Sequence, residues 1–479
     1  MPSFIIHCSL FTFGFLLRLV PLGRYVTPDE PAWVYRAIRF ADALAARDWT
    51  AIPSTGHPGV TTMWLGAVGV AVQRLLAPTE SAVHLDWIRR MAWLAPENGE
   101  AFQHLAFFLP WSRVAVALVA TLGLVVLYPL LARIFNRRVA LLTVGLLTLD
   151  PFLIGHSGLL HTDALLATFV LLALAAALNG LREPRRAVWW ALPTWWALPT
   201  WWAPSTWWAL STWWALSGLF TGLALLTKTP AIILLPFILL LRVIAALPRN
   251  SRSAIRNLPS LVAHCSLFIF LIAITLFALY PALWTGPADT FRTLLAFAEK
   301  HVETAQRPIF FAGQTTDNPG PAFYPVVFLF RVSPLVLVGL LIGLVTLRRL
   351  PTDHRLTFLL MLAFAIGFGA LMSLGAKKHD RYLLPAFPPL TLAAVLGWER
   401  VSKRVASKQI IIILIQLALT LSFIPYPLTG FNPLVGGPWI ANRVLSTDWG
   451  EGMGAAARWL NQLPDADRLT VAALSVPTF

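Results

Sequence analysis

Long apolar stretches constrain this chain more than any other feature. Of its 479 residues, 57% are hydrophobic and only 12% are charged, and the mean hydropathy is +0.69. Soluble domains carry about 25% charged residues, so the composition excludes an ordinary soluble protein. A transmembrane helix needs about 20 apolar residues. We therefore predict an all-α integral membrane protein with eleven transmembrane helices, at 4–22, 107–132, 139–158, 162–181, 213–230, 231–247, 259–281, 325–347, 356–374, 382–398 and 409–425.

The basic residues predict how these helices are oriented. Lys and Arg concentrate in cytoplasmic loops, which also explains the net charge of +15 without a nucleic-acid partner. Alternate loops each carry three or four basic residues, at 133–138, 182–186, 249–256, 348–355 and 400–408. The opposite set is predicted to face outward, namely 23–106, 159–161, 228–230, 282–324, 375–381 and the C-terminal tail.

The predicted domain organisation is one multi-span domain at 1–425 and a short outer tail at 426–479. The first outer loop, 23–106, contains an apolar stretch that we interpret as one or two helices lying on or dipping into the outer surface, since a twelfth span would invert every later loop. Residues 189–218 are five Trp-rich six-residue units, interpreted as a tandem expansion at the cytoplasmic headgroup level. We interpret Phe4–Val20 as a retained anchor without a cleavage site.

Few acidic residues occur, so their positions are informative. Asp29 and Glu30 follow the first predicted span in the motif TPDEP, and Asp163 lies in LLHTDALL at the outer end of a later span. Carboxylates at a membrane surface can act as a general base with a positioning group. The alternative is structural, because Thr, Asp and Glu also cap and begin helices. Asp150 lies inside a span, where it can mark a helix break that faces a cavity.

Basic residues on the predicted outer face form a second group. The turn GAKKHDRY contains Lys377, Lys378 and Arg381, and Lys228 lies between two later spans. Short outer loops usually avoid such charge, so these residues predict a site for a phosphate or lipid headgroup. The alternative is a surface cluster that Asp380 partly neutralises. Acids and cations on one membrane face suit an amphiphile with a phosphate head, although a transporter has the same pattern.

The order of several motifs resembles glycosyltransferase family 39, which includes protein O-mannosyltransferases and the lipid A aminoarabinose transferase. RLVPLGRYVTPDEPAWVYRA followed by HPG resembles the first outer loop of that family, and GLALLTKTPA and KKHDRYLLPAFP match its later segments. The resemblance covers roughly residues 10–425. It implies a polyprenyl-phosphate sugar donor, transfer on the outer face, and inversion at the anomeric carbon.

The resemblance also implies residue roles. Asp29 matches the essential acidic residue of the first loop and implies a base, Glu30 matches its partner, and Asp163 matches the second acidic residue. The remaining candidates are donor-phosphate contacts and substrate-binding side chains. The phosphate candidates, chosen by position and chemistry, are Lys377, Lys378, Arg381 and Lys228, and the substrate-binding candidates are His57, His161 and Tyr382. His57 precedes Pro58-Gly59 where many relatives have a Pro pair, which is a departure from the family pattern.

We therefore predict an inverting glycosyltransferase of a bacterial-type inner or plasma membrane, transferring a hexosyl or pentosyl unit on the outer face. The expected partners are a polyprenyl-phosphate sugar donor, membrane lipids, and a lipid, glycan or protein acceptor. No cofactor is assigned; a divalent metal is conceivable beside His156, His161 and Asp163. The alternatives are a multi-span lipid or solute transporter without transferase chemistry, and a polysaccharide ligase or polymerase of related architecture.

Overall fold

The protein is described here by a computed structural model. It covers residues 2–53, 57–91, 99–182, 207–246, 251–304, 308–402, 406–447 and 449–471. Within these ranges nearly all regular structure is helical, and the named strands form a single antiparallel hairpin of β1 (Ile309–Phe311) and β2 (Gln314–Thr316). The predicted all-α class is therefore confirmed.

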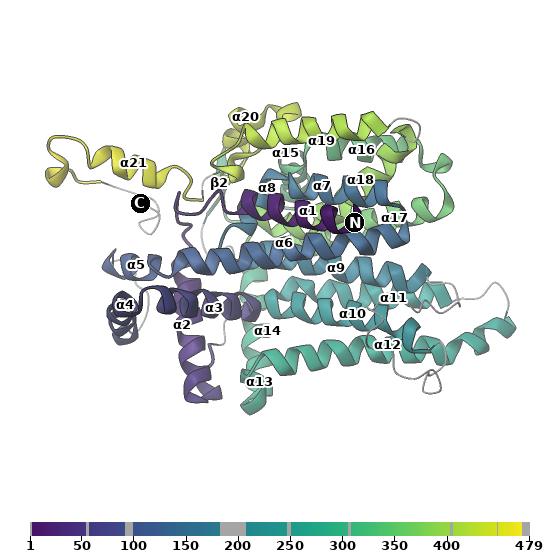
Figure 1. The fold of residues 1–479 in the computed structure, drawn as a ribbon, viewed down its shortest axis with the longest axis horizontal. Helices are drawn as coiled ribbons and strands as arrows, with labels where there is room; N and C mark the ends of the chain where they lie inside the picture. The colour runs from purple at the N-terminus through teal and green to yellow at the C-terminus, as the bar shows by residue number, and fades with distance from the viewer. Residues whose placement is uncertain are drawn as a thin grey trace.

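Long helices lie side by side along one direction and form the body of the molecule (Figure 1). In chain order they are α1 (Pro2–Arg18), α6 (Leu109–Ile134), α7 (Arg137–Thr148), α9 (Thr162–Arg182), α10 (Trp207–Thr227), α11 (Leu234–Ala246), α12 (Ser251–Leu279), α16 (Pro334–Val345), α17 (Thr352–Leu374), α18 (Phe387–Ser402) and α19 (Ala406–Leu421). The other α-helices are α2 (Glu30–Ala46), α3 (Val60–Leu76), α4 (Pro78–Arg90), α5 (Gly99–Ala106), α8 (Pro151–Ser157), α13 (Ala282–Thr285), α14 (Pro287–Glu303), α15 (Phe323–Arg331), α20 (Gly437–Val444) and α21 (Met453–Leu460).

The predicted count of eleven spans is not confirmed. Among the described residues, five helices are long and apolar enough to cross a membrane, and up to seven spans result if each of two bent helix pairs counts as one. The pair α7 and α8 bends by 64°, and α15 and α16 bend by 111°. Both breaks precede a proline, Pro151 or Pro334, which disfavours helical backbone at the residue before it. Other predicted spans correspond to shorter helices, such as α1 and α19.

Contacts place alternate loops at the same end of the bundle. At one end, Arg182 donates to the carbonyl of Ile134 over 3.0 Å, and Asn136 donates to Oε1 of Glu399 over 2.8 Å. The loops at the other end meet around Asp29, as described below. This arrangement agrees with the alternation predicted from the basic residues. Which end faces outward remains a prediction.

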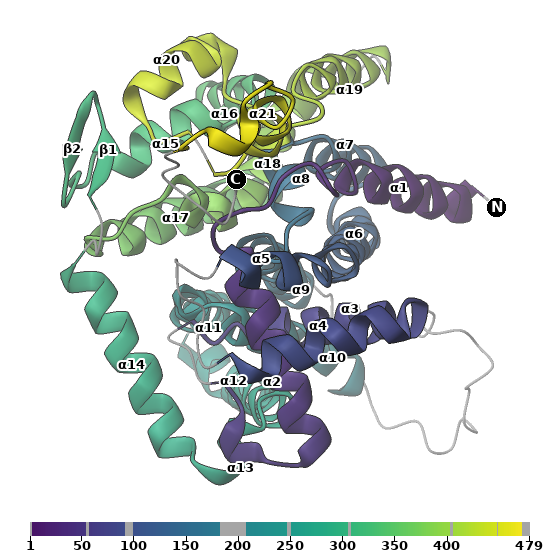
Figure 2. The same cartoon turned by 90° about the vertical axis from the view of Figure 1, so that its left-hand side faces the viewer.

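The segment predicted as a long outer loop with helices contains α2, α3, α4 and α5. Figure 2 looks along the bundle and shows these helices from that end. Its helix α3 packs closely against α6 at Gly69. A Cβ atom there would lie only 2.3 Å from the backbone nitrogen of Ser112. The start of α3 is also tied to the end of α10, since the hydroxyls of Thr61 and Thr227 are 2.7 Å apart. The first loop is thereby fixed next to Lys228, which follows α10 directly.

The Trp-rich repeat is only partly covered by the described residues. Its units up to residue 206 lie outside them, and residues from Trp207 onward form the first turns of α10. Trp214 is buried at 1% exposure and packs against the ring of His264 in α12, with 5.7 Å between ring centroids. The last units of the repeat therefore contribute to helix packing.

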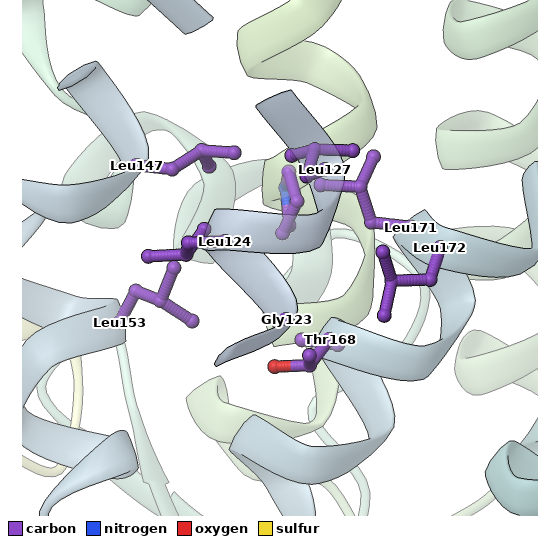
Figure 3. Close-up of a pocket in the computed structure, with 10 residues that line it drawn as sticks. Gly123, Leu124, Leu127, Leu147, Leu153, Thr168, Leu171 and Leu172 are labelled. Carbon is purple, nitrogen blue, oxygen red and sulfur yellow. The ribbon is translucent and has the colours of Figure 1, made fainter. Parts of the chain in front are cut away.

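The core centres on α9, most of which is buried inside the bundle. A pocket beside it lies between α6, α7, α8 and α9, and its lining is mainly leucine side chains (Figure 3). Binding sites need a few convergent polar groups to orient a ligand. This lining supplies one hydroxyl, that of Thr168, which donates to the carbonyl of Ala164 in its own helix. The pocket is a packing feature of the core.

Candidate functional site

Four segments that are distant in sequence meet at one end of the bundle. They are the loop before α2, the turn between α8 and α9, the junction after α10, and the 3-10 helix η6 (Asp380–Ala386). Together they bring five ionisable side chains into one network. We call these residues the charge cluster: Asp29, His161, Asp163, Lys228 and Arg381.

Asp29 is the exposed member of the cluster. It occupies the N-cap position of α2, but its side chain makes no capping hydrogen bond. Its carboxylate instead faces the cluster, where Oδ2 lies 3.1 Å from Nη2 of Arg381 and 3.4 Å from Nε2 of His161. The side chain remains 42% exposed, whereas those of the other four members are at most 11% exposed. Asp29 is thus the carboxylate that a bound molecule can reach.

Asp163 is the buried carboxylate of the cluster. It lies in the first turn of α9, where the helix dipole favours a negative charge. Lys228 donates from Nζ to its Oδ1 over 2.7 Å, and the two side chains are 1% and 3% exposed. The Lys228 ammonium also lies 4.0 Å from the ring centroid of Tyr382. A buried ion pair of this geometry fixes α9, the end of α10 and η6 relative to one another.

His161 and Arg381 each bridge the two carboxylates. His161 places Nδ1 3.1 Å from Asp163 and Nε2 3.4 Å from Asp29. Arg381 places Nη2 3.1 Å from Asp29 and Nε 3.5 Å from Asp163. Trp33 of α2 packs edge-on against the His161 ring, with centroids 6.2 Å apart. Both bridging groups are therefore held in fixed orientations beside the exposed carboxylate.

The network changes the proton affinities of its members outside the spans. Burial alone would raise the pKa of Asp29, but the hydrogen bond from His161 and the charge of Arg381 hold that pKa well below its ordinary value. Burial would lower the pKa of His161, yet Asp163 and Asp29 raise it. Burial lowers the pKa of Lys228, and the charge of Asp163 opposes that effect. Asp29 is accordingly ionised at neutral pH.

Glu30 faces a different partner from its neighbour Asp29. Its carboxylate is 0% exposed and forms two hydrogen bonds with Arg113 of α6, at 2.7 and 2.5 Å. It also accepts from the backbone nitrogens of Thr27 and Leu160, at 2.9 and 3.0 Å. The contacts with Arg113 and Leu160 join the start of α2 to α6 and to the turn before α9. This position gives Glu30 a structural part in holding the cluster together.

Replacing Glu30 with Gln should lower stability more than it changes chemistry. The amide keeps the shape but loses the charge-assisted bonds to Arg113, which is 2% exposed. The expected loss is about 1–3 kcal/mol, because a buried charged partner remains incompletely satisfied. The apparent melting temperature in detergent should fall, while the folded fraction should keep its activity. An unchanged melting temperature together with lost activity would contradict a structural role.

Lys378, another predicted phosphate contact, binds groups outside the charge cluster. Lys378 is 1% exposed, and its Nζ donates to Oδ1 of Asn318 over 3.0 Å and to the carbonyl of Gly375. Burial lowers the pKa of His379 well below its usual range, and the charge of Lys377 lowers that pKa further. The structure therefore brings Arg381 and Lys228 to the two carboxylates and engages Lys378 with the β2–α15 connection.

Two of the three predicted substrate-binding residues lie at the charge cluster. His161 and Tyr382 lie at the cluster, as described above, with Tyr382 only 8% exposed. The ring of His57 lies edge-on to that of Phe297 in α14, 5.0 Å away. Gly59, two residues later, has φ of +58°, and a Cβ there would lie 2.1 Å from Trp33. Glycine at position 59 therefore makes room for Trp33, the side chain that packs against His161.

Sequence reasoning missed several groups around the cluster. Arg113 lies within a predicted span, and an arginine among apolar residues is a signal of a functional or structural centre. Asp380, which would partly neutralise the basic turn in the alternative of a surface cluster, pairs with Arg331 over 2.5 Å. Trp449 of the C-terminal segment contacts Arg381 and His161, and no sequence signal predicted that contact.

No metal site is evident in the described ranges, since they contain no group of three or more His, Cys, Asp or Glu residues placed to hold one ion. The oxygens of Asp163 are engaged by Lys228, His161 and Arg381, and His156 is buried against Phe152 with 4.7 Å between ring centroids. The chemistry available at the cluster is thus that of a reachable carboxylate beside fixed cationic groups.

Comparisons with known proteins support the resemblance stated above. Residues 110–201 match the model of a family described as dolichyl-phosphate-mannose-protein mannosyltransferase. That segment covers α6 to α9 and therefore includes Arg113, His161 and Asp163. No curated protein matches the chain.

The fold is similar to that of solved structures. ArnT from Cupriavidus metallidurans bound to undecaprenyl phosphate matches with a TM-score of 0.54 and 18% identity, covering 89% of this chain and 65% of that protein. Its apo structure matches with a TM-score of 0.54 and 20% identity, covering 88% and 65%. The chain thus spans less than two thirds of that protein's length. The oligosaccharyltransferase from Archaeoglobus fulgidus gives a TM-score of 0.45 at 13% identity, covering 96% of this chain and 59% of that one.

These findings confirm the predicted resemblance and the type of fold. The family match lies in the segment that contains Asp163, and the fold resembles that of ArnT, which was crystallised with undecaprenyl phosphate. Together with the long apolar helices, they identify the chain as an integral membrane protein.

Proposed function

We propose that this protein is a glycosyltransferase that moves a sugar from a polyprenyl-phosphate donor to an acceptor at one membrane face, with inversion at the anomeric carbon. The observation that carries this proposal is the charge cluster, in which an ionised, reachable Asp29 lies 3.1 Å from Arg381. The family match and the ArnT-like fold support the class of donor. We propose that the cluster faces outward, because the basic residues of the alternate loops are expected on the cytoplasmic side.

In this proposal Asp29 is the general base. The acceptor hydroxyl or amine attacks C1 of the sugar, the C1–O bond to the lipid phosphate breaks, and the acceptor proton passes to the Asp29 carboxylate. Arg381 and His161 keep this carboxylate ionised and in position, so that it carries no proton of its own when the acceptor arrives. Direct attack on the face opposite the phosphate gives inversion without a covalent intermediate.

The cationic groups stabilise the leaving phosphate. Arg381 presents a planar fork to anions, and its charge is only partly balanced because it shares Asp29 and Asp163 with other partners. Negative charge grows on the phosphate oxygen as the C1–O bond breaks, and fixed positive groups favour that change most. We assign Lys228 a supporting role, because its ammonium is already paired with Asp163.

The function can be tested with the full chain in proteoliposomes. Undecaprenyl-phosphate sugars radiolabelled in the sugar, both hexosyl and pentosyl, are supplied with a membrane lipid extract as acceptor. The proposal predicts that label leaves one donor and that undecaprenyl phosphate accumulates. Movement of intact donor between leaflets without cleavage would instead support the transporter alternative.

The rate of transfer should fall as pH rises through the raised pKa of His161. The carboxylates Asp163 and Asp29 favour protonated His161, so its positive charge is present below that pKa and lost above it. The depressed pKa of Asp29 means that acid should inactivate only below the ordinary aspartate range of about 4. A pH–rate profile of wild type and His161→Asn tests this, since the alkaline fall should disappear in the variant. An identical alkaline fall in both proteins would contradict it.

A further inference from the structure

The C-terminal segment returns to the charge cluster after forming α20 at the edge of the molecule. Where α20 ends, the carbonyl of Val444 accepts a hydrogen bond from the backbone of Ala312 over 2.8 Å, and Leu445 forms a β-bridge with Phe311. Leu445 is itself 2% exposed. The chain is thus anchored to the β1–β2 hairpin just before it reaches the cluster, and Figure 2 shows α20 beside that hairpin.

Trp449 follows this anchor and contacts the two bridging groups of the cluster. Its ring centroid lies 4.3 Å from the guanidinium carbon of Arg381, which is the geometry of a cation–π interaction. It also lies 5.1 Å from the ring of His161 at an interplanar angle of 87°, and 5.4 Å from the ring of His156. One side chain therefore covers both groups that bridge Asp29 and Asp163.

The local backbone fixes the orientation of this tryptophan. Its backbone nitrogen donates to Oε2 of Glu451 over 2.7 Å, and the next residues include Gly450 and Gly452 with φ of +102° and +80°. Only glycine adopts such backbone readily, so the turn is built into the sequence. Beyond the turn, a Cβ on Gly454 would lie 3.4 Å from the carbonyl of Arg24. The segment is held against the loop that carries Asp29.

We propose that Trp449 is a positioning residue of the transfer site and acts through Arg381 and His161. This inference rests on the proposed function and extends it to the C-terminal segment, which lies outside the matched family segment at 110–201. Trp449 restricts rotation of the Arg381 guanidinium, so that its Nη2 stays at Asp29 and its Nε at Asp163. It also limits the access of water, which would screen the charges of both groups.

The effect should appear in the chemical step more than in donor binding. Arg381 and His161 keep their charges when Trp449 is removed, so the donor phosphate is still attracted. Their placement becomes less exact, and a misplacement of about 1 Å in a site can lower the rate by about 10²-fold. We therefore expect Trp449→Ala to reduce kcat by about 10- to 100-fold with a smaller change in KM. Trp449→Phe should restore most of the rate, because it returns an aromatic face.

The matched control is Trp439→Ala. Trp439 belongs to the same C-terminal segment but is 82% exposed on α20, and its replacement should leave kcat unchanged. A second control is a double-variant cycle with Arg381→Lys. If Trp449 acts through the guanidinium, Trp449→Ala should cost much less in the Arg381→Lys background than in wild type. Equal costs in both backgrounds would overturn the proposal, as would full activity of Trp449→Ala.

Hydrogen–deuterium exchange gives a readout that does not need turnover. Peptides that contain residues 376–381 should exchange faster in Trp449→Ala than in wild type or Trp439→Ala, because the cover over Arg381 is lost. Unchanged exchange in these peptides would contradict the positioning role. If wild type shows no sugar transfer, the proposed function fails, and the exchange comparison still decides whether Trp449 holds this turn in place.

Discussion

Replacement of Asp29 by Asn is expected to lower the rate of sugar transfer by about 10²- to 10⁴-fold, the usual contribution of a general base. The amide keeps the size of the side chain and an oxygen that accepts a hydrogen bond from Arg381. It cannot take the proton from the hydroxyl or amine of the acceptor substrate. The substitution leaves Arg381, the proposed binding group for the donor phosphate, in place. The affinity for the donor should therefore stay within a few-fold of that of wild type. Steady-state kinetics together with donor binding in detergent measure both quantities.

The control for this variant is Asp289→Asn. Asp289 lies in the first turn of α14, its side chain is 80% exposed, and it pairs only with the equally exposed Arg292 among the contacts described here. It removes one negative charge without touching the cluster and should leave transfer unchanged. Turnover by Asp29→Asn at the rate of wild type would show that Asp29 is not the base.

The second large effect is expected from Asp163→Leu. Lys228 would then carry an ammonium with 3% exposure and no carboxylate partner, and breaking a buried pair in this way costs about 3–5 kcal/mol. His161 would lose its ion-pair contact with Asp163 at the same time. The folded protein should become scarce after detergent extraction, and its apparent melting temperature should fall sharply.

A second variant separates stability from activity. Removing both charges in Asp163→Leu with Lys228→Met should recover most of the lost stability, because replacing a buried ion pair by apolar groups is often neutral. Transfer should stay low in the double variant, since His161 and Arg381 no longer have their second carboxylate. A double variant no more stable than Asp163→Leu alone would contradict the pairing. Size-exclusion chromatography and thermal unfolding supply the measurement.

The location of the acids and of two cations could be predicted because it follows from chain topology. Every second loop of an up-and-down helical bundle lies at the same end. Residues in those loops are therefore expected near one another. Asp29, Asp163, Lys228 and Arg381 all lie in such loops or at their edges, and the structure brings them within hydrogen-bond or ion-pair distance.

The direction of each side chain could not be predicted in the same way. Asp29 and Glu30 are adjacent in sequence, but the start of α2 turns one towards Arg381 and the other towards Arg113. Lys378 was chosen with Arg381 for its charge, yet its ammonium is engaged by Asn318 from a distant connection. These outcomes depend on partners that are 60 to 352 positions away, and spacing along the chain contains no information about them.

The division into spans was limited by a local effect. Sequences such as LTLDPFLIG are apolar enough to be counted as one helix, whereas the structure ends α7 before Asp150 and begins α8 at Pro151. Asp150 caps α8 by accepting from the backbone of Leu153 over 2.8 Å. The interpretation of Asp150 as a helix break therefore agrees with the structure, while hydropathy alone joined the two helices.

A single-turnover experiment can show whether the charge cluster transfers sugar from a lipid phosphate. Purified wild type and Asp29→Asn are mixed in excess with a doubly labelled undecaprenyl-phosphate sugar and acceptor lipids. We expect wild type to release one undecaprenyl phosphate for each sugar transferred, and Asp29→Asn to bind the donor but release almost none. Equal release by both proteins, or no release by wild type with any donor, would contradict it.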